Sequence, residues 1–150
     1  MQESSVRVFI PLSFSDLESE QLEPQLVFAV TPKVASLGES YGYDQEDCEG
    51  LAADYAAMHS CAFESNQRRG RRLVACVEVT SQLTGLDNDG VGSALLGQPV
   101  SWRQVQSFLA DGEPLGDLVE RAACDEAAWD ELSSHYLEWF DVSEKTDLAS

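Results

Sequence analysis

The sequence predicts an α+β or α/β fold, with one mixed sheet of about four strands packed against a long central helix and C-terminal helices. Three observations predict it: stretches with the apolar alternation of strands, one long segment with apolar residues at helical spacing, and a helical pattern after residue 112. A chain of 150 residues fits one domain. We expect a single globular domain spanning 1–150, with a core at 6–142 and flexible tails at 1–5 and 143–150.

Two strands and two short helices are predicted before residue 40. Val6–Ile10 alternates and is followed by proline, which is typical of a strand that ends there. A serine three residues before a glutamate is a capping-box pattern and predicts a short helix at about Asp16–Leu22. Gln25–Val30 is apolar nearly throughout, which predicts a central strand. The next helix starts with Thr31 as N-cap and a proline in the first turn, and it should end near Gly38.

The clearest helix is predicted over Tyr43–Phe63. Acidic residues crowd its first turn, where they favour the positive end of the helix dipole. Apolar residues then recur at steps of three and four, which predicts one stripe facing the core. The stripe consists of Cys48, Leu51, Tyr55, Met58 and Ala62.

The middle of the chain predicts two further strands separated by a loop. Arg72–Thr80 has apolar residues on both sides and predicts a buried strand. Ser81–Gln98 contains four glycines and no clear period, so it predicts a long loop that is either functional or mobile. The apolar residues of Pro99–Leu109 do not all fall on alternate positions. This pattern favours a strand with an irregularity and leaves a helix as the alternative.

The segment from Gly112 to Phe140 is predicted to be helical. A polar interruption at Asp125 and Glu126 indicates two consecutive helices or one kinked helix, and a polar tail follows. The apolar residues at helical spacing are Leu115, Leu118, Ala122, Trp129, Leu132, Tyr136 and Trp139.

The chain is strongly acidic, with 27 acidic and nine basic residues and a formal net charge of −18. Such a charge repels phosphate, so direct binding to nucleic acid or to an anionic membrane is disfavoured. It suits solubility or a basic protein partner instead. The start of the chain lacks a basic leader before an apolar run, and we therefore expect a cytoplasmic protein that does not cross a membrane.

The candidate chemistry is sparse. The four cysteines, at 48, 61, 76 and 124, form no C-x-x-C pair and are expected to be reduced, buried thiols. Neither a phosphate-binding loop nor a complete calcium loop is recognisable, so we predict no cofactor and no metal site. His59 flanks the central apolar stripe, where a structural role is favoured over a catalytic or metal-binding one. His135 is the weak candidate for a catalytic residue.

Four of the nine basic residues gather before the third strand, at Arg68, Arg69, Arg71 and Arg72. Around a glycine that permits a sharp turn, such a cluster is expected in a surface loop. Its guanidinium groups could bind a phosphate or an acidic partner. The favoured alternative is structural: the arginines neutralise a helix C-terminus and pair with nearby carboxylates.

Five segments, "VRVFIP", "FAVTP", "RRLVACVEV", "VSWRQVQSFLAD" and "SHYLEWFDVSE", occur in this order, and together they make the chain resemble a small actinobacterial protein family of unknown function. The resemblance covers Val6 to Glu144 and depends on an RVxxP-like first strand and an LxWFD-like terminal segment. It implies a cytoplasmic single-domain protein and supplies no catalytic residues. A five-residue N-terminal extension and the glycine-bearing loop after Thr80 depart from the family pattern.

Three function hypotheses follow. The leading one is a non-enzymatic interaction or regulatory protein whose partner, if electrostatically steered, is basic. The second is an acidic nucleic-acid mimic that occupies a basic DNA-binding protein. The third is a small hydrolase or transferase that uses His135 with a nearby carboxylate. The oligomeric state cannot be read from the sequence.

Overall fold

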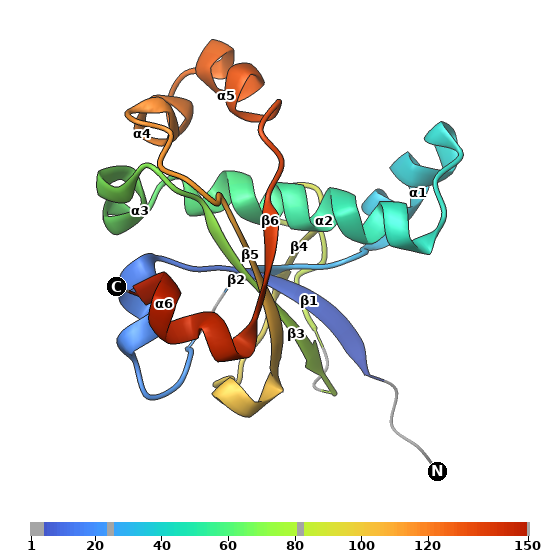
Figure 1. Cartoon of the computed structure of the whole chain (residues 1–150). Coiled ribbons are helices and arrows are strands. Elements are labelled where there is room, and N and C mark those ends of the chain that lie inside the picture. Colours follow the sequence, from blue (N-terminus) through green and yellow to red (C-terminus); the bar gives the residue numbers. More distant parts are fainter. Residues whose placement is uncertain (1–4, 24–25, 81–82, 150) are drawn as a thin grey trace.

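A computed structural model describes residues 5–23, 26–80 and 83–149 of the chain. Its centre is one sheet with strand order β4-β2-β1-β3-β5-β6, and the long helix α2 (Gln45–Ser60) crosses one face of this sheet (Figure 1). All five strand pairings of that sheet are antiparallel. The α+β expectation is confirmed, whereas the expectation of about four strands in a mixed sheet is wrong, because the sheet has six strands.

The two longest pairings hold the centre of the sheet together, between β1 and β3 and between β3 and β5. The predicted strands near residues 6, 26, 73 and 105 are confirmed, and the irregularity expected in the fourth is a register shift opposite Cys76 and Val77. Two short strands were missing from the prediction. The strands are β1 (Val6–Pro11), β2 (Leu26–Phe28), β3 (Leu73–Val79), β4 (Ser93–Leu95), β5 (Val105–Ala110) and β6 (Glu138–Asp141).

Six α-helices and three short 3₁₀ helices are present in the described residues. The α-helices are α1 (Pro32–Tyr41), α2 (Gln45–Ser60), α3 (Glu64–Arg69), α4 (Leu118–Ala122), α5 (Glu126–Leu132) and α6 (Lys145–Ala149). The 3₁₀ helices are η1 (Phe14–Glu18), η2 (Trp102–Gln104) and η3 (Val142–Glu144). In the described part of the chain, no helix is long and apolar enough to cross a membrane.

Helix α1 starts where its cap signals predict but ends later than predicted, and η1 differs from the prediction at both ends. Thr31 caps α1 as predicted, and its hydroxyl accepts a hydrogen bond from the Val34 N–H. The helix continues past Gly38 to Tyr41, where Gly42 ends it with a φ of 73°. Gly38 lies inside the helix, and Cys48 of α2 packs against it, so its missing side chain serves close packing rather than ending the helix. The capping box of η1 uses Ser13 rather than the predicted Ser15. This 3₁₀ helix therefore covers Phe14–Glu18 instead of the predicted Asp16–Leu22.

The central helix is shorter than predicted and turns a different face to the sheet. α2 ends at Ser60, and α3 follows as a separate helix. Of the predicted stripe, Cys48 is buried but Met58 is 41% exposed. The buried face is formed by small side chains, which allow the helix to lie close to the sheet. Its residues are Cys48, Ala52, Ala53, Ala56, Ala57 and Ser60.

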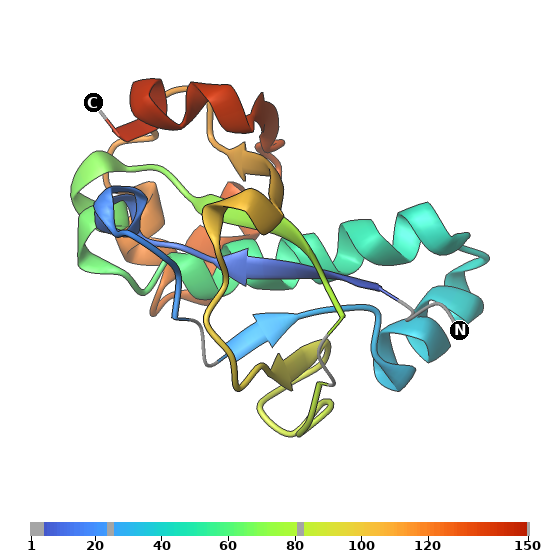
Figure 2. The same ribbon diagram turned by 90° about the horizontal axis from the view of Figure 1, so that it is seen from below.

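The core consists of two layers on the two faces of the sheet and a smaller cluster around α4 and α5. One face packs against α2, and the other packs against η1, Val100 and Leu148 of α6 (Figures 1 and 2). The segment expected as a polar tail from residue 143 therefore includes a helix with a buried leucine.

The helical prediction for the last third is half correct. α4 and α5 are two helices separated at Asp125, whose carboxylate caps α5 by accepting from the Ala127 N–H. The stretch around Trp139 is strand β6 instead of helix. Its four residues, two exposed and then two partly buried, show no strand period that could outweigh the helical spacing preceding them.

Candidate functional site

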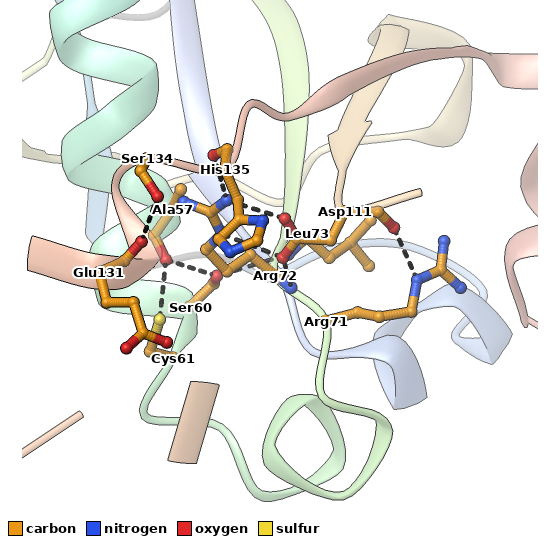
Figure 3. A network of polar contacts seen from close by, with 10 residues as sticks. All are labelled: Ala57, Ser60, Cys61, Arg71, Arg72, Leu73, Asp111, Glu131, Ser134 and His135. Carbon is orange, nitrogen blue, oxygen red and sulfur yellow. Dashed lines mark hydrogen bonds and ion pairs between the residues drawn. The ribbon is translucent and has the colours of Figure 1, made fainter. Parts of the chain in front are cut away.

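Arg72 belongs to a buried ion pair at the start of β3. Its Nη2 lies 2.8 Å from Asp111 Oδ1, and its Nε lies 3.0 Å from Oδ2; both residues are 3% exposed. The Arg72 backbone N–H also donates to Asp111 Oδ2 at 2.8 Å. Figure 3 shows that the same guanidinium reaches the loop after α5, where Nη2 donates to the His135 carbonyl at 2.8 Å. Arg72 thus joins β3, the end of β5 and the segment that leads to β6.

Arg71 and Arg69 lie near the ring of Phe14. Arg71 Nε donates to the Asp111 carbonyl at 2.7 Å, and its guanidinium carbon lies 5.0 Å from the Phe14 centroid. Burial and the neighbouring Arg69 lower the pKa of Arg71. Arg69 donates to the carbonyls of Leu148 and Ala149 at 3.2 and 2.9 Å, so it holds α6 in place.

Arg68 is the exposed member of the cluster. It lies with Arg69 in helix α3 rather than in the expected surface loop, and only Gly70, with a φ of 67°, forms the turn. Arg68 lines a hollow of about 280 Å³ together with Ser65. Within the described residues, the Ser65 hydroxyl is buried and has no hydrogen-bond partner. Three arginines therefore have structural contacts, and anion binding by the cluster stays a prediction.

His135 lies in the exposed loop between α5 and β6. The hydrogen bonds described for it are made by its backbone: its N–H donates to the Leu132 carbonyl, and its carbonyl accepts from Arg72. This arrangement explains a positioning role for the His135 backbone, and it provides no argument for catalysis by the imidazole.

His59 lies on α2 between two aromatic rings, 6.0 Å from the Phe28 centroid and 5.9 Å from the Phe63 centroid. Burial lowers its pKa. Within the described residues, no group of three or more histidine, cysteine or acidic side chains could hold a metal ion.

The cysteines are free thiols, as predicted, but they differ in exposure. Cys48, Cys61 and Cys76 are buried, whereas Cys124 is exposed between α4 and α5. Burial raises the pKa of Cys61 to about 11, which makes that thiol a poor nucleophile. The expectation that all four are buried is wrong for Cys124, because the polar break between the two helices exposes it.

The loop predicted over 81–98 contains β4 and a turn fastened by Asp87; its residues 81–82 lie outside the described part. Asp87 has a φ of 62° and accepts hydrogen bonds from the Thr31 hydroxyl at 2.6 Å, the Gly92 N–H at 2.8 Å and the Lys33 N–H at 3.2 Å. Burial alone would raise its pKa, but these hydrogen bonds hold the pKa below the ordinary value. The loop is therefore pinned to the start of α1 on the β4 side of the sheet.

The opposite side of the sheet ends at β6, and we call residues 136–141 the β6 edge. Two large aromatic side chains are exposed here: Tyr136 by 91% and Trp139 by 63%. Trp139 pairs with Leu109, which faces the α2 side of the sheet, but α2 packs on β1, β2 and β3. Trp139 thus lies beyond the part of the sheet that α2 covers.

The backbone of the β6 edge offers hydrogen-bonding groups to a partner. The Asp111 N–H donates to the Arg72 carbonyl, just before β3. Because backbone groups alternate in direction along a strand, the N–H and C=O groups of Ala110 and Phe108 on β5 point toward β6. The backbone N–H and C=O groups of their partners on β6, Glu138 and Phe140, point back to β5. The N–H and C=O of Trp139 consequently point outward. The helical spacing of the sequence predicts a helix at Trp139, and this prediction is wrong because the residue lies in strand β6.

The comparisons with known proteins yield one family. A model described as a family of unknown function, DUF6912, matches residues 6–149. Neither the curated proteins nor the solved structures include a match to the chain. The resemblance inferred from the sequence to a family of unknown function is confirmed, while the actinobacterial source and the terminal motifs stay predictions.

Proposed function

The chain belongs to the family of unknown function DUF6912, and we propose that it is a non-enzymatic interaction protein that binds a basic, extended segment of a partner along the β6 edge. The observation that carries the proposal is the exposure of Tyr136 and Trp139 beside an outward-facing strand backbone. Large aromatic residues are enriched at the centres of protein interfaces.

Strand addition is the mode of binding that suits this surface. An extended peptide that pairs with an edge strand gains affinity from backbone hydrogen bonds and specificity from alternate side chains. Proteins usually protect such edges with lysine, proline or a covering segment. β6 contains neither lysine nor proline and is the last strand of the described sheet.

The acidic residues at the β6 edge favour a basic partner. The β6 edge includes Glu138 and Asp141, and the exposed Glu131 precedes it in α5. In a chain with a net charge of −18, a second copy of the same acidic edge would be repelled, whereas lysine or arginine side chains would be attracted. A cytoplasmic location, in which thiols stay reduced, is supported by the three buried free cysteines.

The proposal is tested with a peptide of alternating lysine and valine, KVKVKVK, which is blocked at its C-terminus and carries a fluorescent label at its N-terminus. The fluorescence anisotropy of the peptide is recorded as the protein is added. Trp139→Ala should weaken binding by about tenfold or more, since a central aromatic contact is removed. Tyr41→Ala is the matched control, because Tyr41 is 61% exposed on α1, away from β6, and this change should leave affinity unaltered.

Two further peptides complete the design. EVEVEVE should bind far more weakly, and KVKVKVK with every backbone amide N-methylated should lose affinity because it cannot donate to the strand. Equal affinity of the wild type and the Trp139→Ala variant would overturn the proposal. A nucleic-acid mimic predicts that outcome, together with tight binding to a folded basic DNA-binding domain that Trp139→Ala leaves unchanged.

A further inference from the structure

A second surface feature lies apart from the β6 edge, where α2 faces the turn between α4 and α5. A hollow of about 620 Å³ opens here, and the loop at residues 89–91 closes another side of it. This volume is in the range of sites that bind small molecules, roughly 300–1,000 Å³. The position of the α4–α5 unit above α2 is visible in Figure 1.

The wall of the hollow is largely aromatic and aliphatic. Aromatic side chains come from three elements: Phe28 from β2, Tyr55 and His59 from α2, and Trp129 from α5. Met58, which is 41% exposed, adds a polarizable side chain to the wall. These groups suit an apolar body, and the faces of the rings attract a cation.

The rim of the hollow is acidic. Asp89, Asp125 and Glu126 line it, and the described lining residues include no lysine or arginine. His59 adds no positive charge at neutral pH, because burial lowers its pKa. The side chains at the rim therefore attract positive charge.

We propose that this hollow binds a small amphipathic organic cation, with its apolar part against Phe28, Met58 and Trp129 and its ammonium group between the aromatic rings and the acidic rim. Two independent features of the same hollow select this ligand class: the aromatic wall and the carboxylates without a basic counterpart. An anionic ligand would meet three carboxylates, and a neutral ligand would leave them unused.

The test uses three probes of similar size in NMR titrations of the ¹⁵N-labelled full chain. Benzyltrimethylammonium is the cation, neopentylbenzene is its uncharged isostere, and 4-tert-butylbenzoate is an anion. The cation should bind about tenfold more tightly than the isostere, with shifts at the Trp129 indole and at Ala62 and Val91. No shifts are expected with the benzoate. Binding of the isostere at equal or higher affinity would overturn the proposal.

Two sets of variants locate the site. Asp89→Asn, Asp125→Asn and Glu126→Gln together should weaken binding of the cation at least fivefold, and α5 should keep its cap because asparagine is also a favoured N-cap residue. The matched control, Glu20→Gln, Glu39→Gln and Glu46→Gln, changes the net charge by the same amount on exposed residues elsewhere and should leave affinity within twofold. Equal losses in both sets would show a general charge effect and refute the site.

A third variant supplies the cation from within the chain. Met58→Lys places an ammonium group at the hollow and should abolish binding of benzyltrimethylammonium, whereas Met58→Gln should reduce it only slightly. Both changes are at an exposed position, and preserved amide spectra would verify the fold. Undiminished binding to Met58→Lys would contradict the proposed location.

Discussion

The two edges of the sheet differ in whether another segment of the chain pairs with the backbone of the edge strand. At the β4 edge, the Thr84 N–H donates to the Leu95 carbonyl at 3.1 Å, and the Leu95 N–H donates to the Thr84 carbonyl at 2.7 Å. The chain thus covers its own strand there, and Asp87 fastens the covering loop. At the β6 edge, Asp141 N–H is occupied by Glu144 of the next turn, while the backbone of Trp139 faces outward. This difference between the two edges is the basis for the proposed binding of a strand at β6, because exposed edge strands are usually protected.

The largest expected effect comes from the ion pair that anchors the β6 edge. Arg72→Ala should lower the free energy of unfolding by about 3–5 kcal/mol, because it leaves the buried Asp111 carboxylate unpaired and releases the His135 carbonyl. Urea unfolding measures this loss. Arg68→Ala, at the exposed position of the same cluster, should change stability by no more than about 0.5 kcal/mol. Similar costs for the two variants would contradict the assigned roles.

The β4 edge should respond to acid. Because the pKa of Asp87 lies below its ordinary value of 3.8, its carboxylate stabilises the fold above that pH, and this contribution is lost as the pH falls through the folded pKa. Asp87→Asn should remove this part of the acid dependence and cost about 1 kcal/mol at pH 7. Asparagine tolerates the left-handed backbone. Unfolding midpoints between pH 7 and pH 2.5 would test it, and an unchanged acid dependence in the variant would contradict it.

The pKa of Asp141, at the β6 edge, also lies below its ordinary value. Hydrogen bonds from Ser143 lower the pKa of this carboxyl, so its contribution is also present at neutral pH and lost in acid. Asp141→Asn should flatten the acid dependence less than Asp87→Asn does, since Asp87 joins segments distant in sequence. Acid titrations of both variants give the comparison, and a larger effect of Asp141→Asn would reverse it.

The smallest effect on stability is expected from the residue proposed to matter most for binding. Trp139→Ala should change the free energy of unfolding by no more than about 0.5 kcal/mol, because its side chain is 63% exposed. The neighbouring Phe140 points to the opposite face and packs against the core, so Phe140→Ala should be clearly destabilising. Thermal unfolding of the two variants checks this, and a loss for Trp139→Ala as large as for Phe140→Ala would identify Trp139 as a core residue.

The fold was predictable where local signals were strong. Alternation correctly predicts β1 and β3, and Thr31 correctly predicts the start of α1, because pairing and capping reinforce the local preference. β4 and β6 were missed because strands of three or four residues have too few positions to show a period, and their pairing partners are distant in sequence. The alanine face of α2 was missed because small residues carry little hydrophobic signal.

The candidate site was less predictable. The arginine cluster is conspicuous in sequence, but only its tertiary contacts reveal that Arg72 is buried against Asp111, 39 residues away. The spacing of apolar residues in the sequence predicts that Trp139 lies on a helical core face. A single exposed aromatic residue has no sequence signature of its own, since its exposure depends on how far α2 extends over the sheet.

Amide hydrogen exchange at Trp139, with and without KVKVKVK, tests the central claim most directly, namely that the β6 edge binds a strand. If the peptide pairs with this edge, exchange of the Trp139 N–H should slow by about tenfold or more while exchange at Thr84 and Leu95 stays unchanged. If the peptide binds and the Trp139 N–H exchanges at its former rate, the β6 edge is not the interaction surface.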